Sequence, residues 1–222
     1  SGMRKMDISI IVPFYDGNKY IKNLLNMVDN NVSNLKKDIK VELIIVNDSP
    51  WVKVQDVTDK HAYEVSILNF EDNVGIQGAR VRGLRAARGT FVHMLDQDDT
   101  IESHFLEKMF HAIGDNDVVV ANGWRKISSG DKPIFLNMNK QCKVNKLFYY
   151  VYLENRILSP GHCLVRKSAI PKEWYKIQLK QNGADDLVLW ILMLCQKARF
   201  IIQQEKLYNH IDTGENVSGD DL

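Results

Sequence analysis

The stretch Phe91-Val-His-Met-Leu-Asp96-Gln-Asp98-Asp99-Thr100 joins an apolar, β-favouring run to three carboxylates within four residues. Side chains alternate between the faces of a strand, so Asp96 and Asp98 are expected on one side and Asp99 on the other. Two carboxylates this close repel each other unless a divalent cation neutralises them. Mg²⁺ or Mn²⁺ held by carboxylates keeps coordination positions that a phosphate group can fill. The stretch therefore predicts a strand ending in a cation and phosphate site; a solvated acidic turn before a helix cap is the alternative.

The segments that precede this stretch alternate between strand and helix patterns. Residues 8–13 and 41–46 are apolar on both faces, which is typical of buried parallel strands. Residues 18–28 place their apolar side chains at helical spacing, and a strand at 65–70 and a helix at 78–87 continue the alternation. The pattern predicts an α/β fold whose sheet is largely parallel and doubly wound.

Polar side chains follow three of the predicted strands. Pro13-Phe-Tyr15-Asp16 follows the first strand, Asn47-Asp48-Ser49 follows the second, and the carboxylates of residues 96–99 follow the fourth. Ligands of parallel α/β sheets bind at the carboxyl ends of the strands. We therefore expect the three clusters to line one crevice.

The regular alternation stops near residue 117. Residues 117–121 and 123–127 predict strand structure, and a helix is expected around Leu147, Val151 and Glu154. A strand at 163–165 follows Ser159-Pro-Gly-His162, and a last helix begins near Asp185. We expect a single domain with a seam near residue 117, whose second half shapes the pocket of a second substrate.

Length, composition and charge exclude several classes of protein. A chain of 222 residues suits one large domain, and 45% hydrophobic residues with a formal net charge of +1 do not suggest a nucleic-acid partner. The cysteines lack CxxC spacing, which favours a reducing compartment, and we interpret all three as packing residues: Cys142, Cys163 and Cys195. The longest apolar run, 187–195, is too short to cross a membrane and the start lacks a signal peptide, so a cytoplasmic protein is expected. We interpret Ser1-Gly2 before Met3 as an expression-tag remnant.

Five segments, in order, resemble the family-2 inverting glycosyltransferases of the GT-A fold. They are Ile11-Val-Pro13-Phe-Tyr15, Ile45-Val-Asn47-Asp48-Ser49, Asn73-Val-Gly75 with Ala79-Arg80, Leu95-Asp96-Gln-Asp98-Asp99, and Gly183-Ala-Asp185-Asp186. The resemblance covers essentially the whole chain. It implies a Rossmann-like, mostly parallel central sheet flanked by helices, with a C-terminal acceptor-binding subregion. Residues 3–222 would form this domain, with 3–116 as the nucleotide-sugar-binding half and 117–222 as the acceptor-binding half.

The resemblance implies that Pro13, Tyr15 and Asp48 hold the nucleoside of a sugar donor. A carboxylate can accept hydrogen bonds from a uracil N–H or a ribose hydroxyl, and an aromatic ring offers a stacking surface. The family usually has Asp-Asp where this chain has Asn47-Asp48, which leaves the preferred base open. On its own, Asp48-Ser49-Pro50 could be a simple turn.

Three further residues are implied to contact the nucleotide: Asn73, Gly75 and Arg80. An arginine near a helix start can neutralise a diphosphate by bidentate contact, and Arg80 alone matches the family pattern. The other arginines of this segment are expected at the surface: Arg82, Arg85 and Arg88.

The pair Asp96-x-Asp98 corresponds to the metal motif of the family. The resemblance implies a divalent cation, Mn²⁺ or Mg²⁺, that stabilises the departing diphosphate. Asp98 is the expected direct ligand of the cation. Asp96 is a second candidate ligand and is expected near the ribose of the nucleotide, and Asp99 is expected to support these two carboxylates. The segment Tyr208-Asn-His210, followed by Asn216 and Ser218, resembles a closing segment of the family. The resemblance implies that His210 approaches the metal or the diphosphate; a structural or surface role is the alternative.

Asp185-Asp186 stands where the family usually has a Glu-Asp pair. One of the two is implied to be the general base that deprotonates the acceptor hydroxyl, which leads to inversion, and we slightly favour Asp186. Both could instead be ordinary capping carboxylates at a helix start. His162 is expected to face the acceptor.

The resemblance thus implies metal-dependent transfer of a hexosyl or N-acetylhexosaminyl group from a nucleotide-diphosphate donor. The expected donor is a UDP-sugar. The acceptor would be a hydroxyl of a glycan or lipid-linked glycan in surface polysaccharide synthesis, with at most peripheral contact at the inner face of the membrane. Two alternatives stay open. Asp96-x-Asp98-x-Thr100 also fits haloacid-dehalogenase-like phosphatases, although three predicted strands precede Asp96 where that class has none. The other is a domain that binds a sugar nucleotide without turnover.

Overall fold

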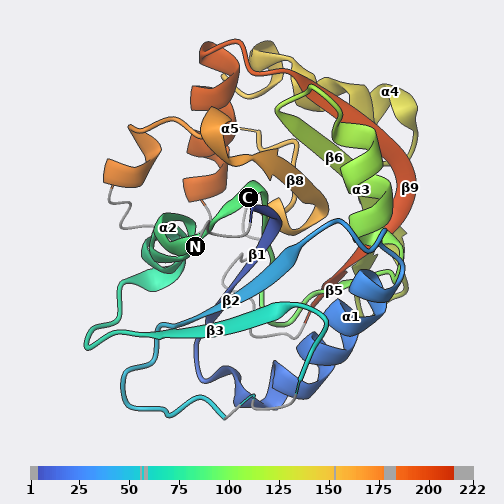
Figure 1. Cartoon of the computed structure of the whole chain (residues 1–222). Coiled ribbons are helices and arrows are strands. Elements are labelled where there is room, and N and C mark those ends of the chain that lie inside the picture. The colour runs from blue at the N-terminus through green and yellow to red at the C-terminus, as the bar shows by residue number, and fades with distance from the viewer. Residues whose placement is uncertain (1–4, 56, 58–59, 153, 178–183, 213–222) are drawn as a thin grey trace.

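Figure 1 shows the computed structural model of the chain, which describes residues 5–55, 57, 60–152, 154–177 and 184–212. Strands and helices alternate through the first half, as the sequence predicts. They are β1 (Met6–Phe14), the 3-10 helix η1 (Gly17–Tyr20), α1 (Ile21–Ser33), β2 (Val41–Asn47), β3 (Glu64–Asn69), α2 (Gly75–Ala86) and β4 (Gly89–Met94).

The second half contains shorter elements. They are β5 (Thr100–Ile101), α3 (Phe105–Ile113), β6 (Val118–Lys126), β7 (Lys132–Pro133), α4 (Met138–Gln141), η2 (Cys142–Asn145), η3 (Leu147–Tyr149), η4 (Pro160–His162), β8 (Cys163–Arg166), η5 (Lys167–Ala169), η6 (Trp174–Lys176), α5 (Asp185–Cys195) and β9 (Phe200–Ile211). The two strand segments expected after residue 117 form the single strand β6, and Tyr208 and His210 lie within β9 rather than after a strand.

The helix expected around Leu147, Val151 and Glu154 is wrong. Only the 3-10 helix η3 forms there, and Val151 and Glu154 follow it outside any helix. The aromatic and β-branched residues of this segment lose side-chain freedom in a helix. Tyr150 is instead fully buried, and its hydroxyl donates to the carbonyl of Val144 at 2.7 Å, which holds the segment as a turn.

The strands described form one mixed sheet with the order β3-β2-β1-β4-β8-β6-β9-β5, and β7 pairs with β6. The four strands of the first half are parallel, as predicted. β8 runs antiparallel to both β4 and β6, and β9 is parallel to β6 but antiparallel to β5. The sheet therefore continues without a break across residue 117, and the end of β9 returns to the segment after β4.

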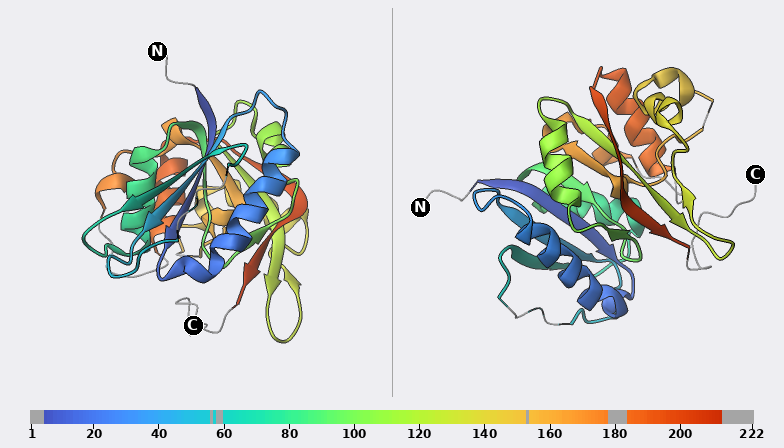
Figure 2. Two further views of the ribbon diagram at one scale, coloured as in Figure 1. Left: turned by 60° about the horizontal axis from the view of Figure 1, so that its bottom comes forward. Right: turned by 90° about the vertical axis from the view of Figure 1, so that its right-hand side faces the viewer.

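Helices cover both faces of this sheet, as the two views of Figure 2 show. α1 and α3 pack their apolar residues, such as Val28 and Phe105, against one face with Ile10. α2 and α5 cover the other face, where Leu84 and Trp190 belong to one apolar cluster. Strands buried on both faces explain why residues 8–13 and 41–46 are apolar on both faces. The two polar residues within them, Ser9 and Glu42, are hydrogen-bonded to each other at 2.6 Å.

The three cysteines differ in burial. Cys163 is buried in the sheet, as the packing interpretation expects, but Cys142 and Cys195 are exposed, so the interpretation is wrong for these two. They lie at the start of η2 and the last residue of α5, where the chain turns away from the core. In the described part of the chain, no helix is both long enough and apolar enough to cross a membrane.

Candidate active site

The polar clusters that follow β1, β2 and β4 meet at one edge of the sheet, as the sequence predicts. The backbone N–H of Asp48 donates to the carbonyl of Phe14 at 2.8 Å, and the N–H of Asp16 donates to Ser49 Oγ at 2.8 Å. Gln97 bridges Tyr15: its Oε1 accepts from the Tyr15 N–H at 3.0 Å and its Nε2 donates to the Tyr15 carbonyl at 3.1 Å. The sequence argument missed Gln97 because it followed only the carboxylates on either side.

The carboxylate of Asp48 is buried and holds the start of α2. Its Oδ1 accepts from the N–H of Val74 at 2.9 Å, and its Oδ2 accepts from the N–H of Gly75 at 3.0 Å and from Asn73 Nδ2 at 2.9 Å. Burial raises the pKa of Asp48, and the two backbone donors oppose that shift. Asp48 therefore orders the loop that carries Asn73 and Gly75, and its contact with a nucleoside stays a prediction.

Arg80 joins the carboxylates of two distant segments. It is 5% exposed, and its Nη2 lies 2.7 Å from Asp96 Oδ1 while its Nη1 lies 2.8 Å from Asp185 Oδ2. Both terminal nitrogens of Arg80 thus contact protein carboxylates. Arg80 neutralises Asp96 and Asp185 in this structure, and its contact with a diphosphate stays a prediction.

Two of the other arginines of α2 and its end, Arg82 and Arg88, have acidic partners. Arg82 pairs with Asp72 at 2.7 Å, Arg85 is exposed, and Arg88 pairs with the buried Glu42 at 2.7 Å. The surface expectation is confirmed for Arg85 and Arg88, whereas Arg82 is half-buried against the Phe70 ring.

Asp98 is a half-buried carboxylate beside two other carboxylates. Burial raises its pKa to about 6, and the charges of Asp99 and Asp96 add to the shift. Among the described residues, no cluster of three His, Cys, Asp or Glu side chains is arranged to hold a metal ion. Mg²⁺ and Mn²⁺ sites commonly use one or two carboxylates plus substrate oxygens, so Asp98 fits a cation that is shared with a ligand's phosphates.

Asp99 is held by the last residues of β9. The Tyr208 hydroxyl and the N–H of Ile211, the latter at 3.0 Å, both donate to its carboxylate. His210 Nδ1 lies 3.3 Å from Asp99 Oδ1, and this hydrogen bond raises the pKa of His210. Because β4 ends at Met94, the acidic residues lie in a turn beyond the strand and strand alternation does not apply to them. Asp99 brings the half-buried His210 to the acidic cluster.

Asp186 lies at the start of α5 in a buried position. Asn155 Nδ2 donates to its Oδ2 at 2.9 Å, and the N–H of Leu187 donates to its Oδ1 at 2.9 Å. Burial raises its pKa to about 7, although the nearby Arg80 acts in the opposite direction. A carboxylate with a pKa near neutrality suits a general base. Its neighbour Asp185 is paired with Arg80, and Ala184 occupies the helix N-cap without a side-chain cap. The capping alternative therefore does not describe Asp185, whereas Asp186 does accept from an N–H of the first turn.

The expectation that His162 faces the acceptor is wrong. His162 is fully buried, its Nδ1 lies 2.8 Å from the carbonyl of Ala121, and burial lowers its pKa to about 4. Its ring packs 5.4 Å from the ring of Tyr208. The Ser-Pro-Gly turn of η4 directs His162 into the core, whereas Ser159 remains near the site with its Oγ 3.4 Å from Asp96 Oδ2.

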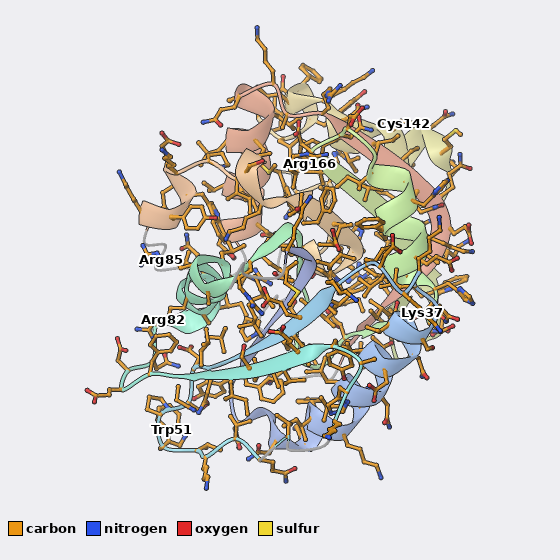
Figure 3. The ribbon with its side chains drawn as sticks, viewed as in Figure 1. Lys37, Trp51, Arg82, Arg85, Cys142 and Arg166 are labelled. Atoms are coloured by element: carbon orange, nitrogen blue, oxygen red, sulfur yellow. The ribbon has the colours of Figure 1, made fainter. Side chains whose placement is uncertain are left out.

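Tyr15 and Trp51 form an exposed aromatic pair next to this edge. Pro13 is buried in β1, whereas Tyr15 is 58% exposed and Trp51 65% exposed. Their ring centroids are 5.8 Å apart and the planes meet at 83°, and Figure 3 shows Trp51 on the loop beyond β2. Trp51 carried no signal in the sequence other than its place two residues after Ser49. Three other expected positions, Gly183, Asn216 and Ser218, lie outside the described residues.

Comparisons with known proteins agree on the family. The sequence profile of glycosyl transferase family 2 matches residues 9–174. Dolichol-phosphate mannosyltransferase of Pyrococcus furiosus is 26% identical over 75% of this chain and 42% of its own length. Minor teichoic acid biosynthesis protein GgaB of Bacillus subtilis is 22% identical over 92% of this chain and 23% of its own length.

A solved structure shares the fold. The structure of S. aureus TarS 1-349 in complex with UDP-GlcNAc superimposes with a TM-score of 0.68 at 23% identity, covering 98% of this chain and 62% of that chain. The GT-A architecture expected from the sequence is therefore confirmed. The chain spans less than half the length of the curated relatives it matches.

Proposed function

This chain belongs to glycosyl transferase family 2, and from that premise we propose that it transfers a sugar from a UDP-linked donor to a hydroxyl of a glycan or lipid-linked glycan acceptor. The observation that carries the proposal is the meeting of Asp96 and Asp185 at the buried Arg80, with the buried Asp186 close to the same guanidinium and Asp98 close to Asp96. The UDP-GlcNAc complex of the similar TarS structure supports a uridine donor carrying a hexose or N-acetylhexosamine. GgaB, the relative named for minor teichoic acid biosynthesis, supports a role in surface polymers.

The proposed reaction is a single displacement at the anomeric carbon. Asp186 accepts the proton of the acceptor hydroxyl, the acceptor oxygen forms the new bond to carbon, and the bond between carbon and the diphosphate oxygen breaks. The attack comes from the side opposite the leaving group, so the configuration inverts. Asn155 orients the carboxylate of Asp186 through its hydrogen bond.

The donor side is assigned to the strand ends. Tyr15 and Trp51 offer ring faces to the base, and Asp48 holds the Asn73–Gly75 loop beside them. Asp98, with Asp96 and His210 nearby, would hold a divalent cation, which supplies Lewis-acid stabilisation of the developing diphosphate charge. Arg80 keeps Asp96 in place by its ion pair.

Two alternative functions have less support. In a haloacid-dehalogenase-like phosphatase, Asp96 would be the nucleophile at the end of the first core strand, but β4 is the fourth strand and Asp96 is paired with Arg80. A domain that binds sugar nucleotides without turnover would not need a buried carboxylate with a pKa near 7 beside the site.

The direct test is the release of UDP from a panel of UDP-sugars in the presence of Mn²⁺, with simple sugars, polyol phosphates and lipid-linked sugars as acceptors. Calorimetric titrations with UDP, GDP and CDP, each with and without Mn²⁺, accompany it. Acceptor-dependent UDP release establishes transfer. Binding of UDP without any release favours the non-catalytic domain, and release of inorganic phosphate from phosphate esters favours the phosphatase.

Asp98→Asn is expected to remove the Mn²⁺-dependent gain in UDP affinity and to leave the metal-free affinity unchanged. The amide keeps the shape of the side chain but loses the charge that attracts the cation. Calorimetry with and without Mn²⁺ measures the difference, and Asp38→Asn, at an exposed position of the loop after α1, is the matched control. An unchanged Mn²⁺ effect in Asp98→Asn would exclude Asp98 as a ligand.

Trp51→Ala is expected to weaken UDP binding about tenfold, since stacking of an aromatic side chain on a base contributes on that order. Tyr152→Ala is the control, because Tyr152 is 73% exposed and lies in the other half of the chain. The quenching of tryptophan fluorescence by UDP gives a second readout. Equal UDP affinity in wild type and Trp51→Ala would remove Trp51 from the donor site.

A further inference from the structure

One surface segment of the acceptor half combines lysines with exposed aromatic residues. Nine large hydrophobic side chains are exposed among the described residues, and five of them lie between residues 136 and 152. Three of these five lie at the end of the segment: Phe148, 63% exposed, Val151 and Tyr152. Together with Lys140, Lys143 and Lys146 they form what we call the basic–aromatic patch. The sheet core does not need these side chains, so their exposure calls for a partner.

The fold presents the patch as an ordered surface. Val144 and Tyr150 are fully buried, and the hydrogen bond from the Tyr150 hydroxyl to the Val144 carbonyl fixes the turn between η2 and η3. The rings of Phe148 and Tyr152 lie 5.6 Å apart. The aromatic side chains thus project together from a segment that is anchored on both sides.

A shallow cavity of about 220 Å³ lies next to these rings, lined by Asn139, Cys142, Lys143, Lys146 and Tyr149. Lys143 Nζ lies 5.0 Å from the centre of the Tyr149 ring. The cavity offers two ammonium groups and an amide but no carboxylate. Such a set of groups suits a phosphate-bearing head group.

The charge of the whole segment has one sign. Residues 132–153 contain four lysines and no aspartate or glutamate. The flanking acids are engaged, since Asp131 pairs with Lys126 at 2.6 Å and Glu154 pairs with Arg156. A second copy of the chain docking by the same patch would bring lysines against lysines. The charge therefore favours an anionic partner over self-association.

We propose that the basic–aromatic patch docks the protein on an anionic lipid bilayer, with the aromatic side chains in the interfacial region and the lysines at the head groups. Aromatic side chains favour the membrane interface, and basic residues add attraction to anionic lipids. Asn155, which holds Asp186, follows the patch by three residues. That link to the acceptor side rests on the proposed function, whereas the docking itself does not.

The test is co-sedimentation of the full chain with vesicles of phosphatidylcholine alone or mixed with phosphatidylglycerol. The expected result is binding to the mixed vesicles only, lost at high salt. K143Q/K146Q is expected to weaken binding about fivefold for each lysine removed, and F148S/Y152S about tenfold. K36Q/K37Q, which makes the same charge change on the loop after α1, is expected to bind like wild type; Figure 3 shows Lys37 well apart from Cys142. Unchanged thermal unfolding shows that each variant is folded.

Cys142 gives an independent readout because it is exposed at the cavity, whereas Cys163 is buried. An environment-sensitive fluorophore on Cys142, in a C195S background, is expected to shift to the blue on adding the mixed vesicles. The proposal would be overturned if the wild type did not bind the mixed vesicles, or if the wild type and the patch variants bound them equally. It would also be overturned if the wild type formed a concentration-dependent dimer that F148S/Y152S abolishes and did not bind lipid.

Discussion

Asp186→Asn is expected to lower kcat for sugar transfer by about a hundredfold to ten-thousandfold, the usual contribution of a general base. UDP affinity should stay within a factor of about two, because the substitution keeps the volume of the side chain and the proposed reaction has Asp186 act on the acceptor. Turnover and calorimetry with the same preparations measure both quantities. An Asp186→Asn protein that loses UDP binding and turnover together would place Asp186 in the donor site instead.

The ionisation of Asp186 should also set the pH dependence of kcat/KM. Burial raises the pKa of Asp186 to about 7, and only the ionised form can take a proton. kcat/KM should therefore fall about tenfold per pH unit below pH 7 and level off above it. Removing the Asn155 donor raises the pKa further, because that hydrogen bond favours the ionised carboxylate. Asn155→Ala should thus move the acid limb to higher pH, a shift that a merely structural role of Asn155 would not produce.

Arg80→Leu is expected to lower the free energy of unfolding by about 3–5 kcal/mol, the usual cost of removing one partner from a buried ion pair. The substitution leaves Asp185 buried and Asp96 without its cation. Urea unfolding at neutral pH measures the loss, and the difference from wild type should narrow at acid pH as the unpaired carboxylates take up protons.

Arg82→Leu is the matched control for that measurement. Arg82 comes from the same helix, its side chain is 20% exposed and lies 4.0 Å from the Phe70 ring centre, and its partner Asp72 is 66% exposed. Exposed pairs contribute about 0–1 kcal/mol. Equal losses of stability in Arg80→Leu and Arg82→Leu would show that the buried ion pairs of Arg80 with Asp96 and Asp185 do not stabilise the fold more than the Arg82 pair does.

The first half of the fold could be predicted because its signals are local. Runs such as residues 41–46 are apolar on both faces, and only a strand inside a doubly covered sheet needs that pattern. The end of each strand could be recognised by its polar cluster. Since parallel strands end at the same edge, the topology predicted that the clusters containing Tyr15, Ser49 and Asp96 would meet. It did not predict that Gln97 would make the hydrogen bonds to Tyr15.

The second half was less predictable because its order comes from distant contacts. The segment around Val151 has apolar spacing that resembles a helix, but the burial of Tyr150 decided its conformation. His162 sits among polar turn residues in the sequence, yet the turn directs it into the core. The ion pairs of Arg80 with Asp96 and Asp185 join residues 16 and 105 positions apart, and no pattern in one sequence reports such a separation.

The capture of Asp99 by β9 has a consequence for how the protein is made. The hydrogen bond from Tyr208 to Asp99 joins residues 109 positions apart, so the acidic loop leaves the ribosome long before the strand that secures it. Until that strand arrives, the three crowded carboxylates have no donors from β9, and β5 has no partner strand. During synthesis the acidic loop and β5 are therefore completed only once β9 has been made, later than the parallel strands of the first half.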